Sequence, residues 1–166
     1  MFQELAPRVW NDEVFSMWDR RWALLTAGTK EHYNTMTVGW GGLGVLWRKP
    51  VVTLYVRPNR YTYTFMESND TFTLSFFEEA YRKQLVLCGS ASGREHDKFA
   101  ECGFHADWAD GTTPYVQEAS LVLVCKKLYW NDLDTKNMDP TLLEHYESDK
   151  VHRMYVGEIT KVLRRS

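Results

Sequence analysis

The sequence is poor in cysteine, and its cysteines lack the spacing of a metal site or a disulfide framework. Its 166 residues contain only Cys88, Cys102 and Cys125, without a C-x-x-C pair or a neighbouring pair of histidines. An odd count without such spacing argues against a zinc site and against a disulfide-stabilised fold. We expect three reduced, mostly buried thiols in a cytoplasmic protein, and no metal.

The sequence also lacks the features of membrane proteins and of general nucleic-acid binders. It has no apolar run long enough to span a membrane, and Met1 to Glu13 lacks the basic and then apolar order of a secretory signal. Twenty Lys and Arg stand against 22 Asp and Glu, for a formal net charge of −2, and the only basic cluster is Arg164-Arg165. Neither a membrane nor a nucleic acid is therefore expected as a partner.

Two kinds of catalytic or cofactor motif are missing as well. No G-x-G-x-x-G precedes an acidic residue in a strand–helix–strand unit, so no Rossmann dinucleotide site is expected. No catalytic triad is evident, and neither Cys88 nor Cys102 has a histidine at the spacing of a nucleophile and its base.

Aromatic residues and segments of β-type composition are abundant. Seven Trp, nine Tyr and eight Phe favour strands and are common in pockets for planar ligands. Alternating or β-branched segments predict strands at 21–29, 33–40, 51–57, 71–77, 118–129 and 153–163, with a bulge or bend at Gly157.

The remaining segments are predicted to be turns, loops and short helices. Gly39 to Gly44 is interpreted as a turn, 104–115 as irregular chain and 131–139 as a loop. Helices are predicted at 10–18, 62–68, 78–87, 94–102 and 140–146. The expected N-caps are Asn11 or Asp12 for the first and Thr62 for the second, and Gly103 is the expected C-cap of the fourth. The small residues Cys88 to Gly93 are expected to end the third. Strands outnumber helices, which favours one mainly β domain over residues 1–166, a closed or partly closed antiparallel barrel with a few short helices.

The segment from Tyr33 to Phe77 contains the residues most suited to binding. Its glycines at 39, 41, 42 and 44 allow close approach of the backbone, and Arg57 and Arg60 follow a strand. Paired guanidinium groups suit a flat, phosphorylated ligand. The alternative is a hairpin with a glycine-rich loop and two solvated arginines, and residue types alone favour neither.

Six short motifs, in order along the chain, resemble the flavin reductase-like family. They are Trp22-Ala23-Leu24-Leu25-Thr26-Ala27-Gly28, Asn34-x-Met36-Thr37-x-Gly39-Trp40, Lys49-Pro50, Arg57-Pro58-x-Arg60-Tyr61-Thr62, Phe72-x-Leu74-Ser75-Phe76 and Ser92-Gly93-Arg94-x-x-Asp97-Lys98. The late Gly157-Glu158-Ile159 segment is also similar. The resemblance implies the FMN-binding split β-barrel fold and FMN as cofactor.

The resemblance further implies a set of site residues. Those expected along the flavin ring are Asn34, Met36, Thr37, Trp40 and Gly41. Those expected around the phosphate are Arg57, Arg60, Thr62, Ser90, Ser92, Gly93 and Lys98, with Tyr61 in the same motif also binding the cofactor. His152 is expected on the side of the hydride donor. The alternatives are a core position for Trp40, an exposed pairing of Lys98 with Asp97 or Glu101, and a surface position for His152.

The activity implied is that of an FMN-dependent oxidoreductase. Hydride from NADH or NADPH would pass through FMN to a flavin, a small acceptor or a partner protein, in a homodimer whose flavin sites lie at the interface. Two alternatives remain: a flavoredoxin-like electron carrier without NAD(P)H activity, and a split-barrel module that binds a cofactor or ligand without redox chemistry.

Overall fold

The computed structural model describes residues 2–7, 13–147 and 150–165. Its main sheet has the strand order β3-β2-β6-β9-β10-β5-β4, with β1 paired to β10, and every pairing is antiparallel. The strands are β1 (Phe2–Leu5), β2 (Ala23–Gly28), β3 (Tyr33–Val38), β4 (Gly41–Leu46), β5 (Lys49–Val56), β6 (Thr71–Phe76), β9 (Leu121–Asp132) and β10 (Arg153–Arg165). The mainly β, antiparallel prediction is confirmed.

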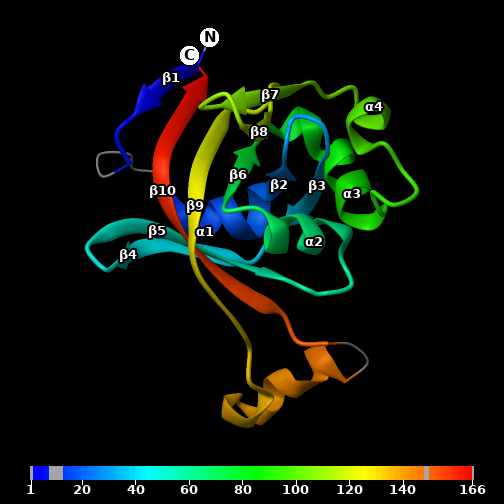
Figure 1. The fold of residues 1–166 in the computed structure, drawn as a ribbon. Coiled ribbons are helices and arrows are strands. Elements are labelled where there is room, and N and C mark those ends of the chain that lie inside the picture. Colours follow the sequence, from blue (N-terminus) through cyan, green and yellow to red (C-terminus); the bar gives the residue numbers. More distant parts are fainter. Residues whose placement is uncertain (1, 8–12, 148–149, 166) are drawn as a thin grey trace.

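Short helices cover parts of this curved sheet (Figure 1). Helices α2 and α3 lie against β3 and β2, and α4 follows α3. The helical elements are α1 (Val14–Ser16), the π-helical turn η1 (Met17–Arg21), α2 (Tyr61–Ser68), η2 (Glu79–Tyr81), α3 (Arg82–Ser90), α4 (Lys98–Cys102), η3 (Thr135–Asn137) and η4 (Pro140–Tyr146). The predicted C-cap is confirmed, because Gly103 is left-handed with φ 66° and closes α4.

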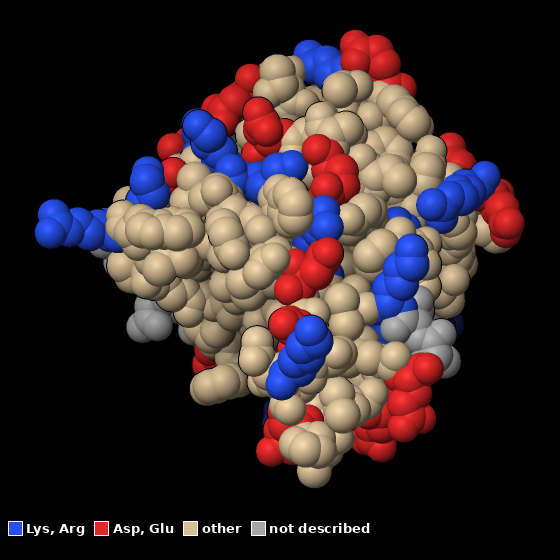
Figure 2. Space-filling model, turned by 60° about the horizontal axis from the view of Figure 1, so that its bottom comes forward, with Lys and Arg blue, Asp and Glu red and all other residues tan. Residues whose placement is uncertain are grey.

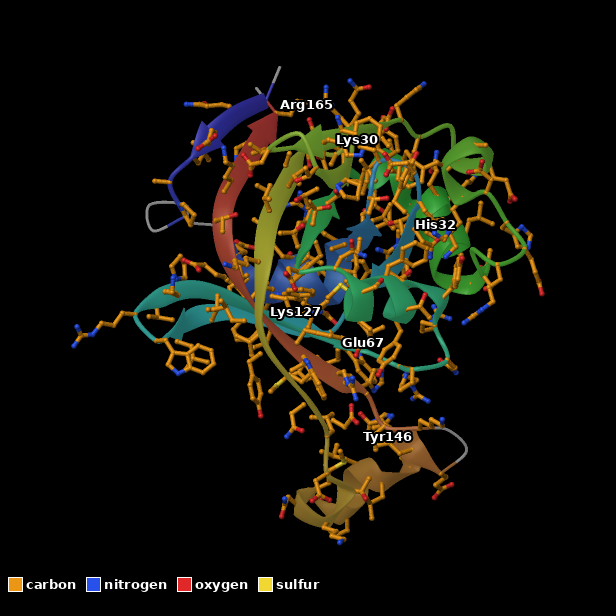
Figure 3. All side chains as sticks on the ribbon, viewed as in Figure 1. Lys30, His32, Glu67, Lys127, Tyr146 and Arg165 are labelled. Atoms are coloured by element: carbon orange, nitrogen blue, oxygen red, sulfur yellow. The ribbon has the colours of Figure 1, made fainter. Side chains whose placement is uncertain are left out.

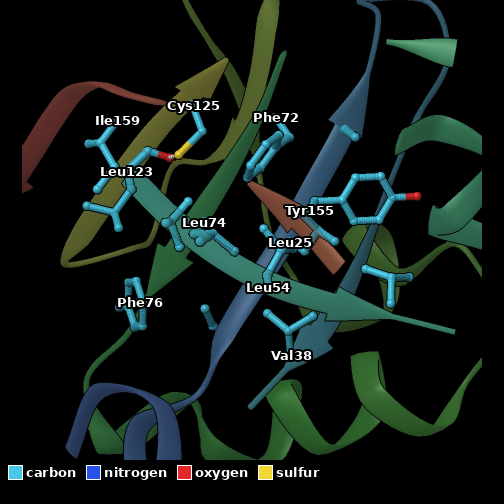
Figure 4. Packing of buried hydrophobic residues seen from close by; sticks show 14 of the residues in the cluster. Leu25, Val38, Leu54, Phe72, Leu74, Phe76, Leu123, Cys125, Tyr155 and Ile159 are labelled. Atoms are coloured by element: carbon cyan, nitrogen blue, oxygen red, sulfur yellow. Dashed lines mark hydrogen bonds between the residues drawn. The ribbon is translucent and has the colours of Figure 1, made fainter. Parts of the chain in front are cut away.

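The larger of two hydrophobic core clusters lies where alternating side chains of facing strands meet. Figure 4 shows Leu25, Leu54, Phe72 and Leu74 packed together with Tyr155, and all five are buried. The alternation seen in the sequence produces this packing, because every second residue of a strand faces the same side. The predicted bulge is also confirmed, since the β9–β10 register shifts between Val156 and Gly157.

The last part of β9 and the first part of β10 extend from the barrel as an arm that carries η3 and η4 (Figure 1). At its base Arg153 donates to both carboxylate oxygens of Asp132, at 2.6 and 3.0 Å, and to Glu67 at 2.8 Å. Its guanidinium also stacks 3.9 Å from the ring centroid of Trp130. These contacts fix the arm to the end of α2, where Figure 3 places Glu67.

The predicted turn at Gly39 to Gly44 is wrong, because strand β4 begins at Gly41 and pairs with β5. The chain reverses later, at Trp47 and Arg48, whose φ angles of 49° and 60° are left-handed. The glycine at 41 is required by packing: a Cβ there would lie 2.5 Å from Trp18 Cη2 and 2.6 Å from the Thr53 carbonyl oxygen. The glycine at 41 was therefore a sign of close packing rather than of a turn.

Two segments predicted to be irregular are ordered strands. Within 104–115 and just beyond it, β7 (Ala106–Ala109) pairs with β8 (Thr113–Val116) around a turn at Asp110 and Gly111. Strand β9 runs on to Asp132, through part of the predicted loop, because its polar end pairs with Arg153 of β10. Cross-strand pairing therefore outweighed local polarity in both places.

Helix boundaries account for the other corrections. Thr62 is not an N-cap: α2 begins at Tyr61, its N-cap is Arg60, and Thr62 is buried inside it. Helix α3 continues through Cys88 to Ser90, and α4 begins only at Lys98. In place of the predicted helix at 10–18 the structure has two short helical elements, α1 and η1, and residues 10–12 lie outside the described residues. Phe15 is exposed, whereas Trp18 is buried.

Candidate functional site

A cavity of about 360 Å³ lies where β3 ends, between the barrel and the arm. Its volume falls in the usual range for small-molecule and cofactor sites, about 300–1,000 Å³. Three parts of the chain form its walls, the end of β3, the end of β5 with the turn after it, and the start of β10. Its lining consists of Met36, Thr37, Val38, Gly39, Trp40, Tyr55, Arg57, Asn59, Arg60 and His152.

The two arginines of the R-P-N-R turn both reach this cavity. Arg57 Nη2 donates to the His145 carbonyl oxygen at 2.8 Å, and its guanidinium lies 5.5 Å from the ring centroid of Tyr146. The Arg60 guanidinium donates to the carbonyl oxygen of Gly89 in α3. Each arginine is thus held by a backbone carbonyl, which places two positive charges at one cavity.

His152 and Trp40 lie together at the arm side of the cavity. Their ring centroids are 5.1 Å apart, and the Tyr146 hydroxyl lies 2.9 Å from His152 Nδ1. His152 is buried and Trp40 is half exposed, at 52%. A surface position for His152 and a core position for Trp40 are therefore both wrong. Burial raises the pKa of Tyr146, with Arg57 opposing, so its hydroxyl keeps its proton at neutral pH.

A second cavity, of about 420 Å³, lies beside Asn34 of β3 and shares no lining residue with the first. Four predicted residues line it instead of the first: Asn34, Tyr61, Gly93 and Lys98. The buried Asn34 amide donates to Thr62 Oγ1 at 2.8 Å, and a Cβ on Gly93 would come within 2.1 Å of Asn34 Oδ1. Glycine at 93 is therefore needed for the packing of Asn34.

Lys98 is enclosed by protein rather than exposed. Its ammonium donates to the carbonyl oxygens of Thr35, at 3.0 Å, and Cys88, at 2.8 Å, and the side chain is buried. Burial lowers its pKa, while the Cys88 thiol acts in the opposite direction. An exposed pairing with Asp97 or Glu101 is thus wrong. The described contacts give Lys98 the role of joining α4, α3 and β3.

The other predicted residues divide between backbone contacts and packing. Thr37, at the first cavity, donates its hydroxyl proton to the Leu85 carbonyl at 2.5 Å. Ser90 Oγ donates to the Val86 carbonyl at 3.0 Å, and Ser92 Oγ accepts from the Arg94 N–H at 3.3 Å. Gly41, Thr62, Ser90 and Ser92, all within the described part of the chain, line neither cavity.

A family model for the flavin reductase like domain matches residues 19–166. The chain belongs to the flavin reductase-like family. A search of curated protein sequences gave no significant match.

Solved structures share the fold of this flavin reductase-like chain. A flavoredoxin from Methanosarcina acetivorans is 24% identical, with a TM-score of 0.70 over 95% of this chain and 74% of that one. An FMN-binding domain of a flavin reductase-like enzyme from Shewanella baltica is 17% identical, with a TM-score of 0.71 over 99% and 77%. The 2-nitrobenzoate 2-nitroreductase of Pseudomonas fluorescens is 19% identical, with a TM-score of 0.68 over 92% and 68%. The fold is that of FMN-binding flavin reductase-like proteins.

Sequence reasoning missed four residues that line the first cavity, Val38, Gly39, Tyr55 and Asn59. It also missed Tyr146, which contacts His152 of the lining. Alternation with the buried Leu54 and Val56 of β5 already places Tyr55 on the opposite face of the strand, but the sequence does not show that this face borders the cavity. Asn59 lies inside the R-P-N-R motif and was assigned only to the turn. Tyr146 had no sequence signal, because its contact with His152 depends on the path of the arm, on which Figure 3 labels it.

The residues of the first cavity fit FMN. Among the lining residues there are two arginines and a histidine, and none is Asp or Glu. Such a lining favours a phosphate dianion. The pairing of β3 with β2 ends at Val38, just before Gly39 and Trp40 of the lining, so the sheet does not use their backbone groups. No described helix is both long and apolar enough to cross a membrane, and the described residues contain no cluster of three or more potential metal ligands.

Proposed function

We propose that this flavin reductase-like protein binds FMN in the first cavity and works as an NAD(P)H-dependent oxidoreductase. One observation carries the proposal: the cavity joins two arginines, Arg57 and Arg60, to a strand end beside Trp40 and His152. Family membership and the FMN-binding fold support it. Bound FMN would supply the chemistry, hydride acceptance from a nicotinamide and onward transfer of electrons.

The protein would bind, orient and shield. Arg60 and Arg57 would hold the phosphate through charge-assisted hydrogen bonds. The backbone from Met36 to Trp40 would orient the ring edge. His152, held by Tyr146, and Trp40 would form the surface against which the donor lies. No acidic or basic side chain needs to transfer a proton in this scheme, because the hydride moves to the cofactor.

We also propose that the protein is a homodimer with each flavin site close to the interface. Large apolar side chains are exposed on the β4–β5 hairpin and on the neighbouring part of β9. They include Val45, Leu46, Trp47, Tyr129 and Trp130, and Trp47 lies 6.4 Å from Tyr129 between ring centroids. Exposed aromatic clusters are typical of protein interfaces.

We further propose a class of partner and a cell compartment, which surface charge and the free thiols support. Figure 2 shows Lys and Arg interspersed with Asp and Glu, with uncharged residues between them, on the face that it presents. This mixture supports a small-molecule or protein acceptor rather than a nucleic acid. The free thiols at 88, 102 and 125 support a cytoplasmic location, which is our inference.

The activity is tested by anaerobic mixing of the FMN-loaded protein with NADH or NADPH. We expect the oxidised-flavin absorbance, at roughly 450 nm, to bleach within seconds with at least one of the two donors. Bound FMN that neither donor bleaches would contradict the reductase activity and favour an electron carrier. A protein that takes up no FMN would contradict both and favour the non-redox module.

A further inference from the structure

Two thiols on neighbouring helices lie close enough to be joined by a disulfide on oxidation. Cys88 Sγ in α3 and Cys102 Sγ in α4 are 3.7 Å apart. Cys88 is fully buried, whereas Cys102 is partly exposed and its Sγ lies 3.8 Å from the Gln84 carbonyl oxygen. A disulfide requires a sulfur–sulfur distance of about 2.05 Å, so closure needs a shift of less than about 2 Å.

The chain between the two thiols contacts strand β3 and one arginine of the proposed flavin site. Lys98, in α4, donates to the carbonyl oxygen of Cys88 and to that of Thr35 in β3. Gly89, next to Cys88, accepts a hydrogen bond from Arg60 at the first cavity. The thiol pair is therefore one residue away from a carbonyl that positions a cavity arginine.

We propose that Cys88 and Cys102 are an oxidative modification site that closes to an intramolecular disulfide when a hydroperoxide enters. The inference is independent of flavin binding, because it rests on the pairing of the two thiols and on the exposure of one of them.

The chemistry balances with hydrogen peroxide as oxidant. The Cys102 thiolate attacks one peroxide oxygen, the O–O bond breaks, and hydroxide leaves while Cys102 becomes a sulfenic acid. The Cys88 sulfur then attacks the Cys102 sulfur, the S–O bond breaks, and the hydroxyl leaves as water with the Cys88 proton. Two thiols lose two electrons and two protons in total, and peroxide is reduced to two waters.

Exposure sets the order of these two steps, and protonation of the thiols sets their speed. Cys102 reacts first because only it is partly exposed. Burial raises the pKa of Cys102, and burial, with Cys102 nearby, raises the pKa of Cys88 to about 12. Both thiols are thus protonated at neutral pH, and reaction with peroxide is slow compared with that of an activated cysteine.

The test treats the reduced, full-length protein with hydrogen peroxide, blocks the remaining thiols with an alkylating agent and maps the peptides by mass. We expect a Cys88–Cys102 linked pair, a loss of about 2 Da before alkylation, and full reversal by dithiothreitol. The melting temperature should rise by roughly 5 °C or more, because the bond closes the chain from Cys88 to Cys102.

Variants of single cysteines provide the controls. Cys125→Ala, which removes a buried cysteine in β9, should leave the cross-link unchanged, whereas Cys102→Ala should abolish it. Three thiols that stay fully alkylatable would overturn the proposal. So would Cys102 oxidised further with a gain of about 32 Da, or a disulfide between two chains. Wild type and Cys125→Ala decide the matter even if Cys102→Ala does not fold.

Discussion

Arg60 is the residue whose removal separates phosphate binding from ring binding. Its guanidinium lies at the first cavity and is held by the Gly89 carbonyl. We predict that Arg60→Ala weakens FMN binding by about 1.5–3 kcal/mol, the loss of one charge-assisted hydrogen bond. Riboflavin, which lacks the phosphate, should lose much less affinity. Both affinities can be measured by fluorescence titration.

Lys83 gives the matched control for charge. It lies in α3, the helix that carries Gly89, and its side chain is exposed and away from the lining of the cavity. Lys83→Ala should therefore change neither affinity by more than about 0.5 kcal/mol. Equal losses of FMN and riboflavin affinity in Arg60→Ala would contradict a phosphate role for Arg60.

Lys98 has a different expected role from the one that its motif implied. Its ammonium is satisfied by two backbone carbonyls in a buried position. We predict that Lys98→Ala lowers the free energy of unfolding by about 2–4 kcal/mol, because both carbonyls lose their donor and a cavity remains. Urea denaturation measures this loss. A variant with wild-type stability but much weaker FMN binding would restore Lys98 as a phosphate ligand.

At the scale of secondary-structure elements, two glycines of β4 provide a matched pair. A Cβ at Gly41 would press on Trp18 and on the backbone of Thr53, whereas a Cβ at Gly44 has no heavy atom within 4 Å among the described residues. We predict that Gly41→Ala destabilises the fold by about 1–3 kcal/mol through overpacking. Gly44→Ala should be neutral or slightly stabilising. Similar effects of the two substitutions in thermal unfolding would contradict the packing account of Gly41.

The arm depends on Arg153, and its contribution should depend on pH. The hydrogen bond from Arg153 lowers the pKa of Asp132 below its ordinary 3.8. A lowered carboxyl pKa stabilises the fold above pH 3.8, and this contribution is lost as the pH falls through the folded-state value. We predict that Arg153→Met costs about 1–2 kcal/mol at pH 7, because solvent screens the partly exposed Asp132 and Glu67, and clearly less near pH 3. Urea unfolding at both pH values measures it, and a pH-independent cost would show that the ion pairs contribute little.

The sequence was informative where local pattern and packing agree. The strands at 51–57 and 71–77 appear as β5 and β6 with one-residue or two-residue shifts, because alternation of buried side chains sets both. Strand β4 was missed because the requirement for Gly41 comes from Trp18, far away in the chain. No local pattern contains that contact.

The candidate site was predictable only in part. Arg57 and Arg60 meet at one cavity because a short motif at a strand end keeps them close. Tyr146 was not predictable, since it reaches His152 only through the path of the arm. Lys98 has the right charge for a phosphate, but only its burial shows that the two carbonyls already occupy its ammonium.

At the scale of the whole molecule, the exposed aromatic surface predicts self-association. Trp47 is 57% exposed at the tip of the β4–β5 hairpin. We predict a particle of twice the chain mass by light scattering, and a shift to the monomer in Trp47→Glu, which places a charge in the apolar patch. Val86→Glu, at an exposed apolar residue of α3, which packs on β3 and β2 rather than on the β4–β5 hairpin, is the control. A wild-type monomer at micromolar concentration would contradict the dimer.

Titration of the cofactor-free protein with FMN, followed by its visible spectrum, tests the central claim most directly. The account predicts saturation at one FMN per chain, a perturbed band at roughly 450 nm, and weaker binding in Arg60→Ala. Extraction of the bound cofactor should return FMN unchanged. A spectrum identical to that of free FMN at every ratio, with all flavin passing through a desalting column separately from the protein, would contradict it.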